Sequence, residues 1–359
     1  PWNTTSITPG TQFMLKITDK IKEFVDSKLD SWKETFGPGF KVIFSCGNTP
    51  GEGEHKILQY IRDNVKLSDN LTLSIYGLDA DLFFLSLSTE LPRIYLVREL
   101  MQFDQDGDGT NAMSSVSSFG YCRIDNLRDI IYTMAKKQFL DYIENNLKSL
   151  KRVKGSKNKD KYTEMETFFS DKKKFLDQMS LQTIVRDFIY MCYLLGNDFV
   201  PQIPSLDIYN GGLENILKNY MIIQHREFKK GVRNYSLISN DKKTDVDSDV
   251  DSDDHPIGIN LEFFTELIGE LAETERMDLQ KMVKKFRKKK YIPGGSEYTV
   301  ARWKRENLVF KIEDPIRFDK ESPSSECKQR YYKHYYKHQY SSLANDSDQD
   351  MIPRICQHY

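Results

Sequence analysis

Pro50-Gly-Glu-Gly-Glu-His-Lys56 holds two carboxylates, Glu52 and Glu54, separated by a single glycine. The apolar run at 41–46 precedes it and predicts a buried strand, and a helix-like run at 56–64 follows it. The two acids therefore fall where a strand passes into a helix. In open α/β sheets this edge is where ligands bind.

The same layout recurs further along the chain. A strand is predicted at 71–76, followed by Gly77-Leu-Asp-Ala-Asp81 and an apolar helix at 82–87, and a third strand is predicted at 93–98. Strands that alternate with helices indicate an α/β fold with a mostly parallel sheet and helices on both faces. Helices are also predicted at 11–36, at 121–150 and over 261–271, with polar or basic loops at 102–119 and 151–161. A mainly helical half is expected from about residue 121.

A third acidic turn, Gly196-Asn-Asp198, follows an apolar helix predicted at 181–195. Five carboxylates then lie next to glycine at element ends: Glu52, Glu54, Asp79, Asp81 and Asp198. Acids gathered in a partly dry site repel one another unless a cation neutralises them, and Mg²⁺ and Mn²⁺ prefer such oxygen ligands. Two such ions can hold the attacking and leaving oxygens of a phosphodiester. The alternative is that each acid pair caps the start of a helix.

The composition excludes little. The 359 residues carry a net charge of −1, so bulk charge neither favours nor excludes a nucleic-acid partner. The five cysteines are scattered without metal-ligand spacing, which indicates free thiols in a reducing compartment. No apolar run has the length of a membrane span, so no membrane partner is expected. The chain begins with Pro1 rather than Met, and we expect it to be a piece of a longer protein.

Three motifs together resemble the XRN family of 5′→3′ exoribonucleases. They are Pro50–Ile57, Tyr76–Leu82, and Leu195–Pro201 with the following Pro204-Ser-Leu206. Ser6–Thr11 and Arg330–Lys333 resemble that family in the same order. The resemblance implies a PIN/flap-endonuclease-like core, two divalent ions (Mg²⁺ or Mn²⁺), and release of nucleoside 5′-monophosphates from RNA with a 5′-monophosphate. By this resemblance, the five acids match five of the family's seven metal-binding acids.

The resemblance also carries expectations about the rest of the protein. It places the other two acids and the 5′-phosphate pocket upstream of Ser6–Thr11, so we expect weak or no hydrolysis by this chain alone. Loop 102–119 has no Cys or His, which makes the cytoplasmic type the closer match, with a nuclear location the alternative. Two other functions stay open: a flap-type structure-specific endonuclease, and a non-catalytic RNA-binding or scaffold fragment.

Four regions are expected from this pattern. Residues 1–120 form the C-terminal part of the α/β nuclease core, and 121–239 form a helical part that completes it. Residues 240–256 are an acidic disordered insert, and 257–359 are a truncated helical second conserved region. Outside the acid set, His55 is a candidate base or orienting residue, Lys56 a candidate phosphate contact, 281–290 a candidate RNA-binding helix or solvated face, and Tyr331–Tyr336 candidate stacking or core residues.

Overall fold

The computed structural model describes residues 4–103, 113–152, 156–196, 202–233, 235–239 and 258–288. The chain divides into two compact units. Pro1–Glu99 with Phe119–Ile124 form the first, called here the α/β unit, and Leu100–Ser118 with Asp125–Tyr359 form the second, called the helical unit. No helix in the described part of the chain combines the length and apolar character needed to cross a bilayer.

The α/β unit begins with a short 3-10 turn, η1 (Thr4–Ser6), and the long helix α1 (Gln12–Phe36). The Thr11 hydroxyl accepts a hydrogen bond from the Met14 N–H at 3.3 Å, which caps the free amides of the first turn. Gly37, with φ of 102°, ends the helix in a conformation that favours glycine. The helix predicted at 11–36 is therefore confirmed, together with the glycine that ends it.

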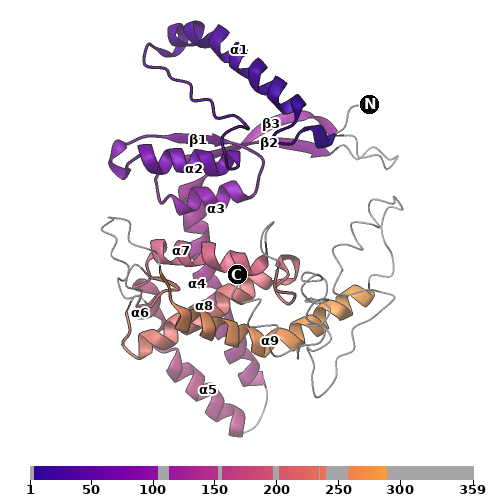
Figure 1. Ribbon diagram of the computed structural model, residues 1–359. Coiled ribbons are helices and arrows are strands. Elements are labelled where there is room, and N and C mark those ends of the chain that lie inside the picture. Colours follow the sequence, from indigo (N-terminus) through magenta and orange to yellow (C-terminus); the bar gives the residue numbers. More distant parts are fainter. Residues whose placement is uncertain are drawn as a thin grey trace, which may run out of the picture. The chain divides into compact units, whose positions relative to one another are not determined.

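A three-stranded sheet has the order β1 (Leu73–Tyr76), β2 (Ile94–Phe103) and β3 (Met113–Arg123), of which β1, the start of β2 and the end of β3 belong to the α/β unit. β1 and β2 run parallel, with Leu73 opposite Ile94 and Tyr76 opposite Val97. This pair confirms the strands predicted at 71–76 and 93–98 and the parallel pairing between them. The connection between them contains α3 (Asp81–Ser88), as a parallel crossover requires. α2 (Gly53–Asn64) packs against α3, and η2 (Leu67–Asp69) leads from α2 toward β1 (Figure 1).

Residues 41–46 correct the sequence prediction. They are irregular rather than a strand, and Ile43 is 65% exposed. A strand is stable only when a neighbour accepts its backbone hydrogen bonds, and within the described ranges no strand pairs with this segment. Two predicted loops are also partly wrong. β3 occupies the end of 102–119, and α5 (Ser156–Phe168) begins within 151–161.

The helical unit is built from α4 (Ile124–Arg152), α5, α6 (Lys172–Asp177), α7 (Leu181–Cys192), α8 (Gly212–Lys229) and α9 (Leu261–Lys288). Two 3-10 turns, η3 (Tyr193–Leu195) and η4 (Ile208–Asn210), connect α7 to α8. A small antiparallel ladder joins β4 (Ile238–Ser239) to β5 (Gly258–Ile259). The helices predicted at 121–150, 181–195 and 261–271 are confirmed, and the mainly helical second half is observed.

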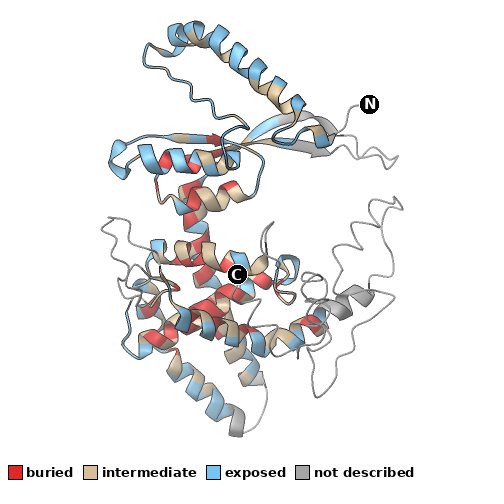
Figure 2. Ribbon diagram, in the orientation of Figure 1, coloured by how far each residue is buried: buried red, intermediate tan, exposed pale blue. Residues whose placement is uncertain are grey.

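Aromatic side chains form the core of the helical unit, where buried positions gather on α4, α7 and α8 (Figure 2). Phe139 of α4 lies 5.3 Å from Phe175 and 5.4 Å from His225, measured between ring centroids. His225 is fully buried, and its Nε2 lies 2.8 Å from a carboxylate oxygen of Asp171. The helical spacing of apolar residues in 121–150 predicts Ile130 among the buried positions, and this prediction is wrong, because Ile130 is 59% exposed.

α9 packs along α8, and the contact is both apolar and ionic (Figure 1). Phe263, Leu267 and Leu271 are buried, as the amphipathic pattern of 261–271 predicts. Arg226 of α8 forms ion pairs with Glu266 and Glu270, which stand one turn apart on α9. The acidic stretch at 240–254 and Tyr331–Tyr336 lie outside the described residues, and α9 covers 281–288 of the predicted basic helix.

Candidate active site

The first acid pair stands at the start of α2. Gly51 has φ of 98°, which turns the chain sharply before Glu52. Glu52 occupies the N-cap position with extended backbone, but its side chain makes no capping hydrogen bond and stays exposed. Glu54 lies in the first turn and is half-buried. The Glu52 carboxylate is therefore not committed to capping, which was the alternative explanation for this pair.

Two neighbours fix this turn. The Nδ1 atom of His55 lies 3.5 Å from a carboxylate oxygen of Glu52, and both side chains are more than half exposed. The ammonium of Lys56 donates a hydrogen bond to the Cys46 carbonyl at 3.0 Å, which ties α2 to the segment before the glycine-rich turn. His55 thus lies beside a neighbouring acid. Lys56 has a structural partner within the described residues, in addition to its proposed phosphate contact.

The second acid pair lies between β1 and α3. Asp79 accepts a hydrogen bond from the backbone N–H of Asp81 at 3.2 Å, so this carboxylate does shape the start of the helix. Asp81 is the first residue of α3 and is half-buried. A Cβ added at Gly77 would lie 2.4 Å from Leu82 Cδ1, so the chain passes close to α3 at this glycine.

Arg98 is a positioning residue that the sequence pattern did not single out. It lies on β2, and its Nη2 donates to the Leu78 carbonyl at 2.6 Å, inside the second acidic turn. Its guanidinium also lies 5.7 Å from the centroid of the Phe83 ring. The sequence offers one signal for this residue. Arg98 ends the strand predicted at 93–98, and the strand predicted before it, at 71–76, leads into the acidic turn at 77–81.

The fifth acid, Asp198, lies outside the described residues, but the elements that flank it are described. α7 and η3 lead to Gly196, whose φ of 83° reverses the chain. On the other side, the Ile203 N–H donates to the Leu194 carbonyl at 3.1 Å. These contacts bring together the two ends of the segment that contains Asp198.

α7 itself is anchored by a buried carboxylate, Asp187. It accepts hydrogen bonds from the Tyr220 hydroxyl at 2.7 Å and from the backbone N–H groups of Leu237 and Ile238, both at 2.9 Å. Burial raises the pKa of Asp187 to about 6, and these three hydrogen bonds oppose the rise. Asp187 therefore joins α7, α8 and β4, and holds the helix that leads to the third acidic turn.

The donor chemistry of these acids suits a hard cation, because all are carboxylates. α2 and α3, which begin at the two pairs, pack against each other. Across the residues that the structure describes, however, no three His, Cys, Asp or Glu side chains stand close enough together to hold a metal ion. The structure thus places four acids at two helix starts of one unit.

Comparison with known proteins gives two family matches. The family described as XRN 5′-3′ exonuclease N-terminus matches residues 1–100, and the one described as Xrn1 helical domain matches residues 178–290. The first range contains both acid pairs and the second contains Asp198. Together the two ranges cover more than half of the chain.

Curated relatives agree. The chain is 32% identical over 225 residues to 5′-3′ exoribonuclease 2 of Candida albicans, covering 60% of this chain and 20% of that protein. It is 30% identical over 261 residues to 5′-3′ exoribonuclease 2 of Eremothecium gossypii, covering 68% and 25%. It is 30% identical over 226 residues to 5′-3′ exoribonuclease 1 of Saccharomyces cerevisiae, covering 61% and 12%. The chain thus spans a quarter or less of the length of these relatives.

Proposed function

Because the chain belongs to the XRN family of 5′-3′ exonucleases, we propose that the whole protein hydrolyses RNA stepwise from its 5′ end. We assign the catalytic carboxylates to Glu52, Glu54, Asp79, Asp81 and Asp198. One observation carries this assignment: two acid-x-acid pairs stand at the starts of two packed helices, in the range that matches the exonuclease family. The Glu52 side chain is exposed and makes no capping hydrogen bond, which leaves its carboxylate accessible to a cofactor or substrate.

The cofactor we propose is Mg²⁺ or Mn²⁺, two ions in the complete enzyme, held by these five acids. When bound, such ions activate water and stabilise the leaving 3′-oxygen of a phosphodiester. The chain's own residues prepare the ligands. His55 lies beside the Glu52 carboxylate, and Asp79 fixes the backbone of Asp81. Arg98 holds the second acidic turn against β2.

The substrate we propose is RNA with a 5′-monophosphate, and the products are nucleoside 5′-monophosphates. The names of the relatives, all 5′-3′ exoribonucleases, support RNA and the direction of attack. We further propose a role in cytoplasmic mRNA decay, supported by the absence of Cys and His from 102–119. The 359-residue chain alone is expected to hydrolyse RNA weakly or not at all, because the resemblance gives it five of the family's seven acids.

A hydrolysis assay tests the reaction class. The substrates are 3′-labelled RNAs with a 5′-monophosphate or a 5′-hydroxyl, and a branched DNA flap, each with Mg²⁺. The expected result is loss of the monophosphorylated RNA with nucleoside monophosphates as products, and slow loss of the 5′-hydroxyl RNA. Internal cuts in the DNA flap would instead indicate a structure-specific endonuclease. RNA binding without hydrolysis, unchanged by Mg²⁺, would indicate a non-catalytic module.

A further inference from the structure

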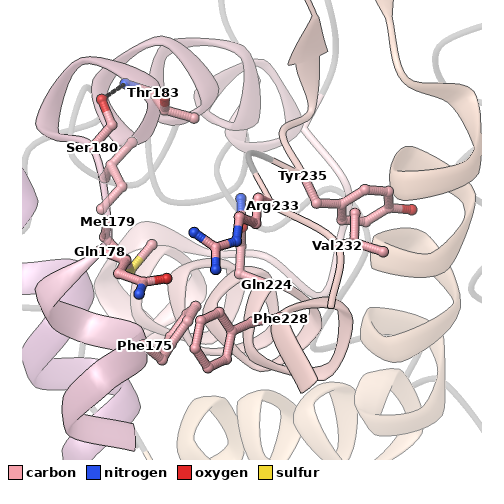
Figure 3. Close-up of a pocket in the computed structure, with 11 residues that line it drawn as sticks. Phe175, Gln178, Met179, Ser180, Thr183, Gln224, Phe228, Val232, Arg233 and Tyr235 are labelled. Carbon is pink, nitrogen blue, oxygen red and sulfur yellow. Dashed lines mark hydrogen bonds between the residues drawn. The ribbon is translucent and has the colours of Figure 1, made fainter. Parts of the chain in front are cut away.

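A cavity of about 360 Å³ lies within the helical unit, and none of the five acids is among the residues that line it (Figure 3). Its walls come from α6, the turn into α7, α8 and the segment after α8. We call it the Arg233 cavity. Small-molecule sites typically occupy about 300–1,000 Å³, so this volume suits one compact ligand of nucleotide size.

Polar groups of two kinds line the Arg233 cavity. Arg233 is exposed, and within the described residues it makes no ion pair with an acid. Figure 3 shows its guanidinium directed over the hollow above Phe175 and Phe228. Gln224 donates an N–H to the Tyr220 hydroxyl at 3.0 Å, which orients the amide and leaves its carbonyl oxygen as an acceptor. A fixed amide can form hydrogen bonds with the edge of a base, and a guanidinium can bind a phosphate.

Aromatic rings form one wall of the cavity. The ring centroids of Phe175 and Phe228 are 5.5 Å apart, and the rings are inclined at 55°. Phe175 is buried, which holds this wall in place, whereas Phe228 is half-buried and offers part of its face. Stacking on such faces stabilises a bound base without regard to base identity.

Charged residues of both signs flank the cavity. Lys172, Lys173 and Lys174 precede Phe175 on α6, and Lys229 and Lys230 follow Phe228 at the end of α8. Glu227 pairs with Lys230, and Asp171 contacts His225. Burial raises the pKa of Tyr235, a residue of the cavity wall, and the nearby carboxylates of Glu262, Glu266 and Glu227 add to that rise. Arg233 lines the cavity itself and favours an anionic group there.

We propose that the Arg233 cavity binds a nucleotide, with the base against Phe228 and the phosphate at Arg233. The nucleotide comes either from a free nucleoside monophosphate or from one residue of an RNA strand. This site shares no residue with the acid set, so it is a second nucleotide contact beyond the proposed hydrolytic function.

Titration calorimetry of the purified chain in EDTA, with no divalent ion, tests the proposal. The probes are AMP, an oligoadenylate RNA with a 5′-hydroxyl, and inorganic phosphate. Saturable binding of AMP supports a free nucleotide as the ligand, and binding of the RNA alone supports a strand. If neither binds, or if phosphate binds as tightly as AMP, the proposal is overturned. Because the readout is binding without metal, failure here is distinct from failure of RNA hydrolysis.

Two variants and a matched control locate the site. Arg233→Gln removes the phosphate contact and is expected to weaken binding about fivefold or more. Val232→Trp, at a residue of the cavity wall that is 40% exposed, is expected to abolish binding by occupying the space. Arg276→Gln makes the same charge change at an exposed position on α9 outside the cavity and should leave affinity within about twofold. Equal binding by all three variants, with unchanged circular dichroism, would overturn the assignment.

Discussion

Gly196 begins the third acidic turn, and its substitution should lower the stability of the helical unit. Its φ of 83° and ψ of 155° belong to a region that only glycine adopts without strain. A Cβ placed there would lie 2.6 Å from the Gln202 backbone nitrogen and 2.8 Å from Gln202 Cα. Strain costs about 1–3 kcal/mol and overpacking against backbone about 1–3 kcal/mol. Gly196→Ala should therefore lower the free energy of unfolding of the helical unit by about 2–6 kcal/mol.

Urea unfolding followed by far-UV circular dichroism measures this loss. Hydrogen exchange should also show faster exchange at the Ile203 N–H, whose bond to the Leu194 carbonyl closes the loop around Asp198. The matched control is Gly269→Ala within α9, where a Cβ meets nothing within 4 Å. That change should stabilise the helix by about 0.5–1 kcal/mol. A loss below about 0.5 kcal/mol for Gly196→Ala would refute the geometric argument.

Three further predictions follow from single contacts. The pKa of Asp187 is about 6 in the fold against an ordinary 3.8, so the folded state binds this proton more tightly. Stability should therefore fall by up to about 3 kcal/mol as the pH rises from about 4 to about 6, and Asp187→Asn should remove this slope in urea titrations. Arg226→Lys should lose the paired contacts with Glu266 and Glu270 and lower the free energy of unfolding by about 1 kcal/mol. The loss should be smaller at high salt, and an equal loss in molar salt would contradict an ionic cause. Thr11→Ala should destabilise α1 by about 1 kcal/mol in thermal unfolding while Thr11→Ser retains most of the cap, and equal losses would contradict the capping role.

The local pattern predicted most helices, because a helix depends on contacts within a few residues, and it predicted the parallel pair because two strands joined through a helix typically pair in parallel. Thr11 and Gly37 mark both ends of α1 in the sequence itself. The strand predicted at 41–46 was wrong because an apolar segment forms a strand only beside another strand that pairs with its backbone. The local sequence does not show whether such a strand is present. β3 was missed because its polar Ser-rich residues, 113–118, read as a loop.

The candidate site, too, could be predicted from the sequence only in part. The positions of Glu52 and Asp79 beside the starts of helices followed from glycine and acid spacing, although the segment before Glu52 is irregular rather than a strand. Arg98 and Asp187 could not be found from sequence, because their partners Leu78 and Leu237 are 20 and 50 residues away. The Arg233 cavity was missed for the same reason, since two stretches about 40 residues apart in the sequence, 175–184 and 224–235, line it.

The most direct test of the central claim is the rate at which the whole protein degrades 5′-monophosphorylated RNA after single acids are neutralised. Asp79→Asn and Glu52→Gln are compared with Asp26→Asn, an exposed acid on α1. Removal of one transition-state interaction typically costs a factor of about 10²–10³, so we predict such losses for the first two variants. Asp26→Asn should keep its rate, and RNA binding in EDTA should be the same for all three. If Asp79→Asn or Glu52→Gln degrades RNA at the unsubstituted rate, the assignment of the acid pairs to catalysis is wrong.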